Sequence, residues 1–226
     1  MSKRVKVFSG FERFWHLAQL ILIFGLLFTG FNIHGTWSVL AFEQALDVHI
    51  VLALSLIGLW VLAIFWHLTT GEWRQYVPTG KGLMPMVLYY AYGIFSGEAK
   101  PYTMTVNAKH NPLQRLAYFG FKVAIAPALW TSGLLLLFYV DWSRTALGTV
   151  LPLAWVAWVH VAAAFALILF LIVHVYMAGT TGKPWFSYLR AMFTDGYEKV
   201  YAGAGEYGTL AQPSSVAVPF AILPAP

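Results

Sequence analysis

The sequence predicts an all-α integral membrane protein built as a four-helix transmembrane bundle. Of its 226 residues 59% are apolar and only 10% are charged, and the mean hydropathy is +0.67. Soluble domains carry roughly 25% charged residues, so this composition excludes an ordinary soluble protein. A bilayer-spanning helix needs about 20 apolar residues. Runs of about that length or longer occur four times, near residues 14–33, 48–68, 116–140 and 151–178.

The first run is expected to be a permanent membrane anchor. It follows the basic segment Met1–Lys6, as the apolar part of a signal peptide would. However, the run is about 20 residues long and lacks a small-residue cleavage site, so we expect the helix to be retained. The third run follows Asn111 and Pro112. These residues are typical of a helix start, where asparagine caps the first turn and proline fits within it.

The connection between the second and third runs, about residues 69–111, is the longest in the chain. Within it, Leu83–Phe95 is apolar and rich in tyrosine but too short to span a bilayer, so we predict a cytoplasmic interfacial helix. Residues 1–200 are expected to form one four-helix membrane domain. Residues 201–226 are rich in Gly, Ala, Pro and Ser and are expected to form an irregular tail.

The lysine and arginine residues are distributed very unevenly between the two sides of the predicted bundle. Four spans place both termini on one side, and of the 14 lysine and arginine residues only Arg144 falls on the other side. Cytoplasmic loops retain positive charge, so we expect a multi-pass protein of the bacterial cytoplasmic (inner) membrane with both termini in the cytoplasm. The net charge of +5 then reflects topology, and no nucleic-acid partner is indicated.

Histidines are the candidate ligands for a cofactor. The chain has no cysteine, which excludes disulfides, iron–sulfur ligation and covalently attached haem c. An ionisable side chain in a span is a functional candidate, because without a partner it costs several kcal/mol. His16 and His174 are expected near the cytoplasmic ends of the first and fourth spans. His49 and His160 are expected at the outer ends of the second and fourth.

The fourth span has the geometry to carry two cofactors. His160 and His174 are 14 residues apart, or about 21 Å along a helix axis, and their side chains fall within about 40° of one face. Two imidazoles are standard axial ligands of an electron-transfer haem, and they leave no open position for oxygen chemistry. The depths therefore predict two haem b groups, an inner and an outer one. Chance alignment and a proton relay are the alternatives.

Three other histidines leave alternatives open. His67 is expected at the cytoplasmic surface, where it could hold a haem propionate, contact a quinone or bind a further haem. His34, at the outer end of the first span, could replace His49 or His160 as a ligand of the outer haem. His110 lies just before the third span.

Several sequence motifs resemble a known family. They are Phe11–His16 (FERFWH), Leu26–Phe31 (LLFTGF), Lys109–Tyr118 (KHNPLQRLAY), Leu129–Gly133 (LWTSG) and the two histidines of the fourth span. Together they resemble the di-haem cytochrome b subunit of bacterial respiratory oxidoreductases. That group includes the formate dehydrogenase gamma subunit, the thiosulfate reductase cytochrome b and the hydrogenase cytochrome b. The resemblance covers about residues 8–195.

The resemblance implies positions for the cofactors. In that family the inner haem is held by residues that match His16 and His174, and the outer haem by residues that match His49 and His160. These are the pairs that the depths also predict. A menaquinone lies near the inner haem in that family, against an Asn-x-x-Gln stretch that precedes the third helix.

The matching amides in this sequence are Asn111 and Gln114, and His67 and His110 are further candidates for the quinone site. Amide and imidazole groups can hydrogen-bond a quinone carbonyl. The alternative is that Asn111 only caps the third helix, and the two roles are compatible.

These features predict a membrane electron carrier rather than a complete enzyme. Two haem b groups would pass electrons between an extracytoplasmic oxidoreductase subunit, with iron–sulfur or multihaem cofactors, and the quinone pool (menaquinone or ubiquinone). The outer loops are too short for a catalytic domain, so the substrate would be set by that partner. One alternative is a stand-alone di-haem cytochrome b that exchanges electrons between superoxide or another small donor and quinone. Another is a haem-free anchor.

Overall fold

The computed structural model describes residues 2–102, 109–182 and 184–201. Four helical segments in these ranges are long and apolar enough to cross a bilayer, which confirms the predicted all-α four-helix membrane protein. They are α1 (Gly10–Ile33), α2 (Phe42–Thr70), the continuous segment Pro112–Leu137, and α8 (Leu153–Thr181).

The first and third segments each begin at a polar cap that lies several residues before the start of the corresponding apolar run. Before α1, the Ser9 hydroxyl accepts from the Glu12 N–H at 3.2 Å, and the Glu12 carboxylate accepts from the Ser9 N–H at 2.7 Å. Asn111 and Gln114 form the same reciprocal pair at α4 (Pro112–Gly120). Such a capping box satisfies N–H groups that the first helical turn leaves free. Hydropathy alone therefore places these helix starts too late.

The third membrane segment is not a regular α-helix. Between α4 and α5 (Ala126–Leu137) lies a one-turn π-helix, η3 (Phe121–Ile125), after which the Ala126 N–H donates to the Phe121 carbonyl. Pro127 follows directly and has no N–H to donate to the carbonyl four residues earlier. The hydrogen-bond register therefore changes at this turn, as it does at π-bulges generally.

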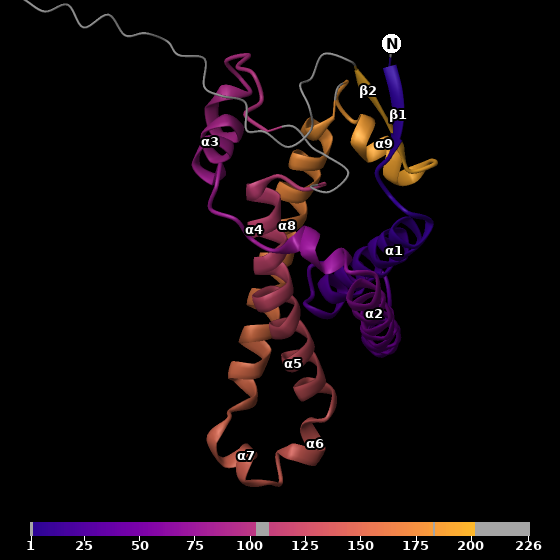
Figure 1. Cartoon of the computed structure of the whole chain (residues 1–226). Coiled ribbons are helices and arrows are strands. Elements are labelled where there is room, and N and C mark those ends of the chain that lie inside the picture. Colours follow the sequence, from indigo (N-terminus) through magenta and orange to yellow (C-terminus); the bar gives the residue numbers. More distant parts are fainter. Residues whose placement is uncertain (1, 103–108, 183, 202–226) are drawn as a thin grey trace, which may run out of the picture.

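The four segments form two helical hairpins (Figure 1). α1 packs along α2, and α5 packs along α8. Two short helices, α6 (Tyr139–Trp142) and α7 (Ala146–Val150), make the turn between α5 and α8. The predicted outer loop of this hairpin therefore has helical structure of its own.

An apolar cluster joins the two hairpins near the middle of their long helices. Its buried members come from both hairpins and are Ile23, Leu56, Trp60, Ala126 and Leu167. The Trp60 ring of α2 stacks on Trp130 of α5 with centroids 5.0 Å apart, and it meets Phe121 edge-on at 5.7 Å. These aromatic contacts fix the two hairpins against each other.

The sequence patterns did not predict the antiparallel pair of β1 (Ser2–Lys6) and β2 (Tyr197–Tyr201). α9 (Ser187–Phe193) precedes β2 and packs against Phe8. Figure 1 shows this sheet and α9 at the opposite end of the molecule from α6 and α7. An even number of spans brings both ends of the bundle to one side, where their backbones can pair. Pairing between such distant segments leaves no local signal in the sequence.

The predicted helix over Leu83–Phe95 is present as α3 (Leu83–Leu88) and the π-turn η2 (Tyr89–Gly93), and a 3₁₀ turn, η1 (Glu72–Tyr76), precedes it. Met86 and Tyr90 form a buried cluster with Met177 of α8. One face of this segment thus packs on protein, while its interfacial position stays a prediction. The predicted irregular tail lies outside the described residues from residue 202 onward.

Candidate functional site

The structure brings four of the predicted ligand histidines together as two pairs. His16 of α1 faces His174 of α8, with ring centroids 6.0 Å apart and planes inclined by 36°. His49 of α2 faces His160 of α8 at 6.3 Å, with planes inclined by 72°. We call these the inner pair and the outer pair. Each pair combines one residue of the α1–α2 hairpin with one of α8, so the sites exist only when the hairpins are assembled.

The ring separations fit two imidazoles that bind one iron from opposite sides. An iron–nitrogen bond of about 2 Å, added on each side to the distance from the nitrogen to the ring centre, separates the centroids by about 6 Å. The observed 6.0 and 6.3 Å agree with this requirement. Among the described residues, no three histidine, aspartate or glutamate side chains are grouped to hold a bare metal ion. Two protein ligands suit a haem iron, because the porphyrin supplies the others.

A threonine holds His49 from the neighbouring helix of its own hairpin. The Thr29 hydroxyl lies 2.9 Å from His49 Nδ1. The same hydroxyl donates to the Gly25 carbonyl at 2.8 Å, and a hydroxyl has a single proton to donate. Thr29 must then accept from the His49 Nδ1–H. This tautomer leaves the lone pair on Nε2, the nitrogen that is free to bind a metal.

A serine repeats this arrangement at His160. The Ser132 hydroxyl of α5 lies 3.0 Å from His160 Nδ1 and donates to the Ala128 carbonyl at 2.5 Å. By the same proton count, His160 Nδ1–H is the donor and Nε2 carries the lone pair. Both members of the outer pair are therefore held in the tautomer that an iron ligand requires.

A glycine follows each of these hydroxyl residues and lets the histidine ring approach the helix. A Cβ atom on Gly30 would lie 3.5 Å from His49 Cε1, and one on Gly133 would lie 3.3 Å from His160 Cε1. The Thr-Gly and Ser-Gly steps thus form matched seats for the two outer rings. Both steps belong to the sequence motifs of the family resemblance, but no role was predicted for them, although a small hydroxyl residue precedes a glycine in the first and third apolar runs.

The inner pair has different surroundings. The Nδ1 atoms of His16 and His174 are buried, and neither has a hydrogen-bond partner among the residues that the structure describes. The His174 ring stacks on Phe170 with centroids 5.6 Å apart and contacts Tyr118 at 5.4 Å. Among the residues that the structure describes, aromatic rings and no hydroxyl acceptor therefore contact this pair.

His67 and His110 lie in an aromatic cluster next to the inner pair, and both contact Tyr76. The centroid distances from Tyr76 are 5.4 Å to His67 and 5.1 Å to His110. His67 also contacts Trp15, and His110 contacts Tyr118. Both histidines thus contact Tyr76, and among the described residues no ring contact between them resembles that of the inner or outer pair.

His67 and His110 each keep one unpaired ring nitrogen. His67 Nδ1 lies 2.6 Å from the Ala63 carbonyl and donates to it, while its Nε2 is buried without a partner among the described residues. His110 Nδ1 is likewise buried without one. Burial, assisted by the charge of Lys109, lowers the pKa of His110 to about 3, so this ring is neutral at physiological pH.

Asn111 and Gln114 are close together but their polar atoms have protein partners. Besides the capping box, Asn111 Nδ2 donates to the Tyr90 hydroxyl at 3.3 Å, and Gln114 Nε2 donates to the Thr181 hydroxyl at 3.2 Å. Both side chains are buried. The capping role is thus confirmed, and a quinone at these amides would have to exchange for Tyr90 or Thr181.

Lys109 forms a buried ion pair at the same end of the bundle. Its Nζ atom lies 2.9 Å from Glu12 and 3.2 Å from Glu72, and both Lys109 and Glu12 side chains are 9% exposed. His34, in contrast, is exposed at the end of α1, with the Thr36 hydroxyl 3.5 Å away. His49 and His160 pair with each other, so the structure gives no support to His34 as their replacement.

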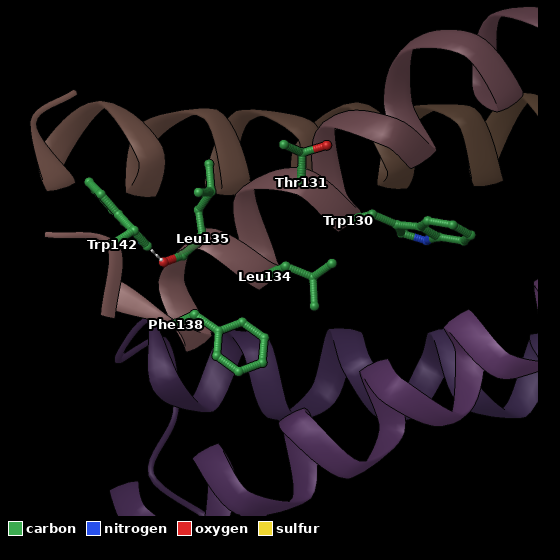
Figure 2. Close-up of a pocket in the computed structure, with 6 residues that line it drawn as sticks. All are labelled: Trp130, Thr131, Leu134, Leu135, Phe138 and Trp142. Carbon is green, nitrogen blue, oxygen red and sulfur yellow. Dashed lines mark hydrogen bonds between the residues drawn. The ribbon is translucent and has the colours of Figure 1, made fainter. Parts of the chain in front are cut away.

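A cavity of about 440 Å³ is lined by residues of α5 and of the following turn, from Trp130 to Trp142. Figure 2 shows its lining of apolar and aromatic side chains, with Phe138 pointing toward the α1–α2 hairpin. The lining residues Thr131 and Leu134 flank Ser132 and Gly133 in the sequence. No titratable side chain lines this cavity, so it offers space but no chemistry of its own.

Comparisons with known proteins point to one family. Residues 7–195 match the family described as prokaryotic cytochrome b561. The chain is also 28% identical over 205 residues to a protein of Escherichia coli (strain K12) named putative cytochrome YdhU. The aligned region covers 88% of this chain and 76% of that protein. No solved structure matches the chain significantly.

Proposed function

Because the chain belongs to the prokaryotic cytochrome b561 family, we propose that it is a transmembrane electron carrier with two haem b groups. Family membership and the four spans make it a multi-pass membrane cytochrome b that uses haem b in electron transfer. The number of haems, their ligands and the redox partners are the proposed part.

The two histidine pairs carry the proposal. His16 and His174 would hold the inner haem, and His49 with His160 the outer one, because both pairs have the ring separation that one iron needs. Bound haem b supplies a one-electron iron couple. The protein's part is to hold the two imidazoles of each pair at this separation. A haem held by two imidazoles would be suited to electron transfer and not to oxygen binding.

The helices set the spacing of the two sites and keep water out between them. His160 and His174 are separated by 14 residues of the uninterrupted helix α8, or about 21 Å along its axis. Leu167, midway between them, belongs to the buried cluster with Ile23 and Leu56. This apolar layer, together with the stack of Trp60 on Trp130, seals the middle of the bundle.

The uneven distribution of positive charge supports an orientation. With both ends of the bundle in the cytoplasm of a bacterium, the inner pair lies near the cytoplasmic face of the inner membrane and the outer pair near the opposite face. The basic residue Lys122 lies over the Tyr76 ring at 3.2 Å, in the aromatic cluster next to the inner pair, which supports this orientation.

Quinone exchange is proposed at the inner end. The unpaired nitrogens of His67 and His110 lie one aromatic ring away from the inner pair, through Trp15 and Tyr118. They could hydrogen-bond a quinone carbonyl more readily than the occupied amides of Asn111 and Gln114. At the outer end, short loops leave room for a separate oxidoreductase subunit with iron–sulfur or multihaem cofactors, as proposed from the sequence.

Haem stoichiometry tests the two-haem proposal. The purified full chain should show b-type bands in a reduced-minus-oxidised spectrum and two haems per chain by pyridine haemochrome assay. His160→Ala should leave one haem, and His174→Ala should also leave one, with a different band position. His34→Ala is the matched control and should retain two. A ratio near one in the unmodified chain, or loss of a haem in His34→Ala alone, would overturn the assignment.

A further inference from the structure

The two histidine pairs differ in the hydrogen bonds of their Nδ1 atoms. In the outer pair, His49 and His160 each donate from Nδ1 to a hydroxyl, at 2.9 Å and 3.0 Å. In the inner pair, the Nδ1 atoms of His16 and His174 have no partner among the described residues. The difference comes from the neighbouring side chains: α1 and α5 place Thr29 and Ser132 at the outer rings, whereas Tyr118 and Phe170 contact His174 of the inner pair through their aromatic rings.

A hydrogen bond at Nδ1 changes how strongly the opposite nitrogen binds a metal. When Nδ1–H donates to an acceptor, electron density on the ring rises and Nε2 becomes a more basic ligand. A more basic ligand stabilises ferric iron over ferrous iron and lowers the reduction potential, for which second-shell hydrogen bonding is one of the protein's means of control. Because both imidazoles of the outer pair donate such a bond, their effects on the reduction potential have the same sign.

We infer that Thr29 and Ser132 make the outer haem the lower-potential site of the two. The inference rests on the proposed function, since it needs a haem at each pair. One electron then moves favourably from the outer ferrous iron, which becomes ferric, to the inner ferric iron, which becomes ferrous. Neither histidine gains or loses a proton, because the Nδ1–H bonds persist in both states. The hydroxyls thus set the direction of electron flow from the outer face toward the inner one.

The hydroxyls are well placed to control the potential without touching the iron. Thr29 and Ser132 each donate to a carbonyl of their own helix, so their oxygen lone pairs are held toward the rings. Deleting one hydroxyl should therefore weaken the polarisation of its ring. Both residues act through a histidine and are positioning residues.

Redox titration of the purified full chain, followed by the absorbance of the b-type bands, tests this inference. Thr29→Val keeps the shape of the side chain and removes the acceptor, and Ser132→Ala does so on the other hairpin. Each should raise the equilibrium constant for reduction of the lower-potential haem by three- to tenfold, where tenfold is about 59 mV for one electron. The reduction potential of the other haem should not change. Thr29→Ser and Ser132→Thr keep a hydroxyl and should leave both reduction potentials at the values of the unmodified chain.

Two further variants make the result unambiguous. His160→Ala, which should lack the outer haem, identifies the transition that belongs to it. Thr131→Val removes the hydroxyl next to Ser132 that lines the apolar cavity, and it should leave both potentials unchanged. If one hydroxyl variant fails to bind the outer haem, the other hairpin's variant still provides the test, because the two seats are separate.

The possible outcomes separate the inference from the function on which it rests. One haem or none in the unmodified chain would refute the two-haem function itself. If the unmodified chain binds two haems but the lower reduction potential is unchanged in both Thr29→Val and Ser132→Ala, only the role of the hydroxyls is refuted. A shift of the higher transition, or assignment of the outer haem to the higher transition by His160→Ala, would refute the proposed direction of electron flow.

Discussion

Replacing Gly133 with isoleucine should remove the outer haem and leave the inner haem in place. A Cβ atom at this position would lie 3.3 Å from His160 Cε1, a few tenths of an ångström inside the roughly 3.5–4.0 Å contact distance of two carbon atoms. Alanine should therefore be accepted after a small shift of the ring. Isoleucine adds two γ-carbons about 1.5 Å farther out. Because it is β-branched in a helix, it has little freedom to turn both of them away from the ring.

The size of the displacement decides the outcome. A γ-carbon directed at the ring would force it to move by about 1.5 Å to recover normal contact, whereas metal–ligand distances tolerate only about 0.2 Å. His160 should then lose the iron. The inner pair, 14 residues away along α8, should be unaffected. The expected haem content falls from two per chain to one in Gly133→Ile and stays at two in Gly133→Ala.

A matched control is available in α2. Nothing lies within 4 Å of a Cβ atom built on Gly58, so Gly58→Ile adds the same bulk within a span without meeting a histidine. Haem content by pyridine haemochrome assay and the reduced spectrum should match those of the unmodified chain. Retention of both haems with unchanged bands in Gly133→Ile would refute the view that this glycine seats His160. Equal losses in Gly58→Ile would do the same.

Two further predictions concern the inner end of the bundle. Lys109→Met should leave the buried Glu12 carboxylate without its cation and lower the free energy of unfolding by about 3–5 kcal/mol, seen as a lower thermal midpoint in detergent. Glu72→Gln should cost much less, because Glu72 is 31% exposed, and equal losses would contradict this ranking. Burial lowers the pKa of His110 to about 3, while an unfolded histidine has a pKa of about 6.5. Only the unfolded chain binds this proton between those values, so the contribution of His110 to stability is complete above pH 6.5 and decreases as the pH falls toward 3. His110→Phe should flatten that part of the pH dependence of the thermal midpoint, and identical slopes would count against a buried neutral ring.

The helical framework follows from the sequence because its causes are local. Runs of about 20 apolar residues can satisfy their backbone groups in a bilayer only as helices, and all four runs are helices in the structure. The pairing of the histidines was also predictable. His160 and His174 sit at two depths of one helix, and a straight helix fixes the depth of every residue by its number.

Other features escaped prediction because they depend on contacts between segments far apart in the chain. The pairing of β1 with β2 joins residues near opposite ends. The hydroxyls of Thr29 and Ser132 could be recognised as partners of His49 and His160 only after the helices were placed side by side. Asn111 and Gln114 were identified as candidates for a quinone, yet Tyr90 and Thr181 from two other segments occupy their amides.

The sequence by itself determined that this protein spans a membrane four times and carries histidines at two depths, since hydropathy and helix rise depend only on residue type and number. The tertiary structure decided how the two depths differ. At the outer pair, the neighbouring helix of the same hairpin contributes one hydroxyl and one glycine to each ring, whereas aromatic side chains contact His174 in the inner pair. A second shell is assembled from neighbouring helices, and its hydrogen bonds depend on how those helices are rotated and packed, which no single span encodes.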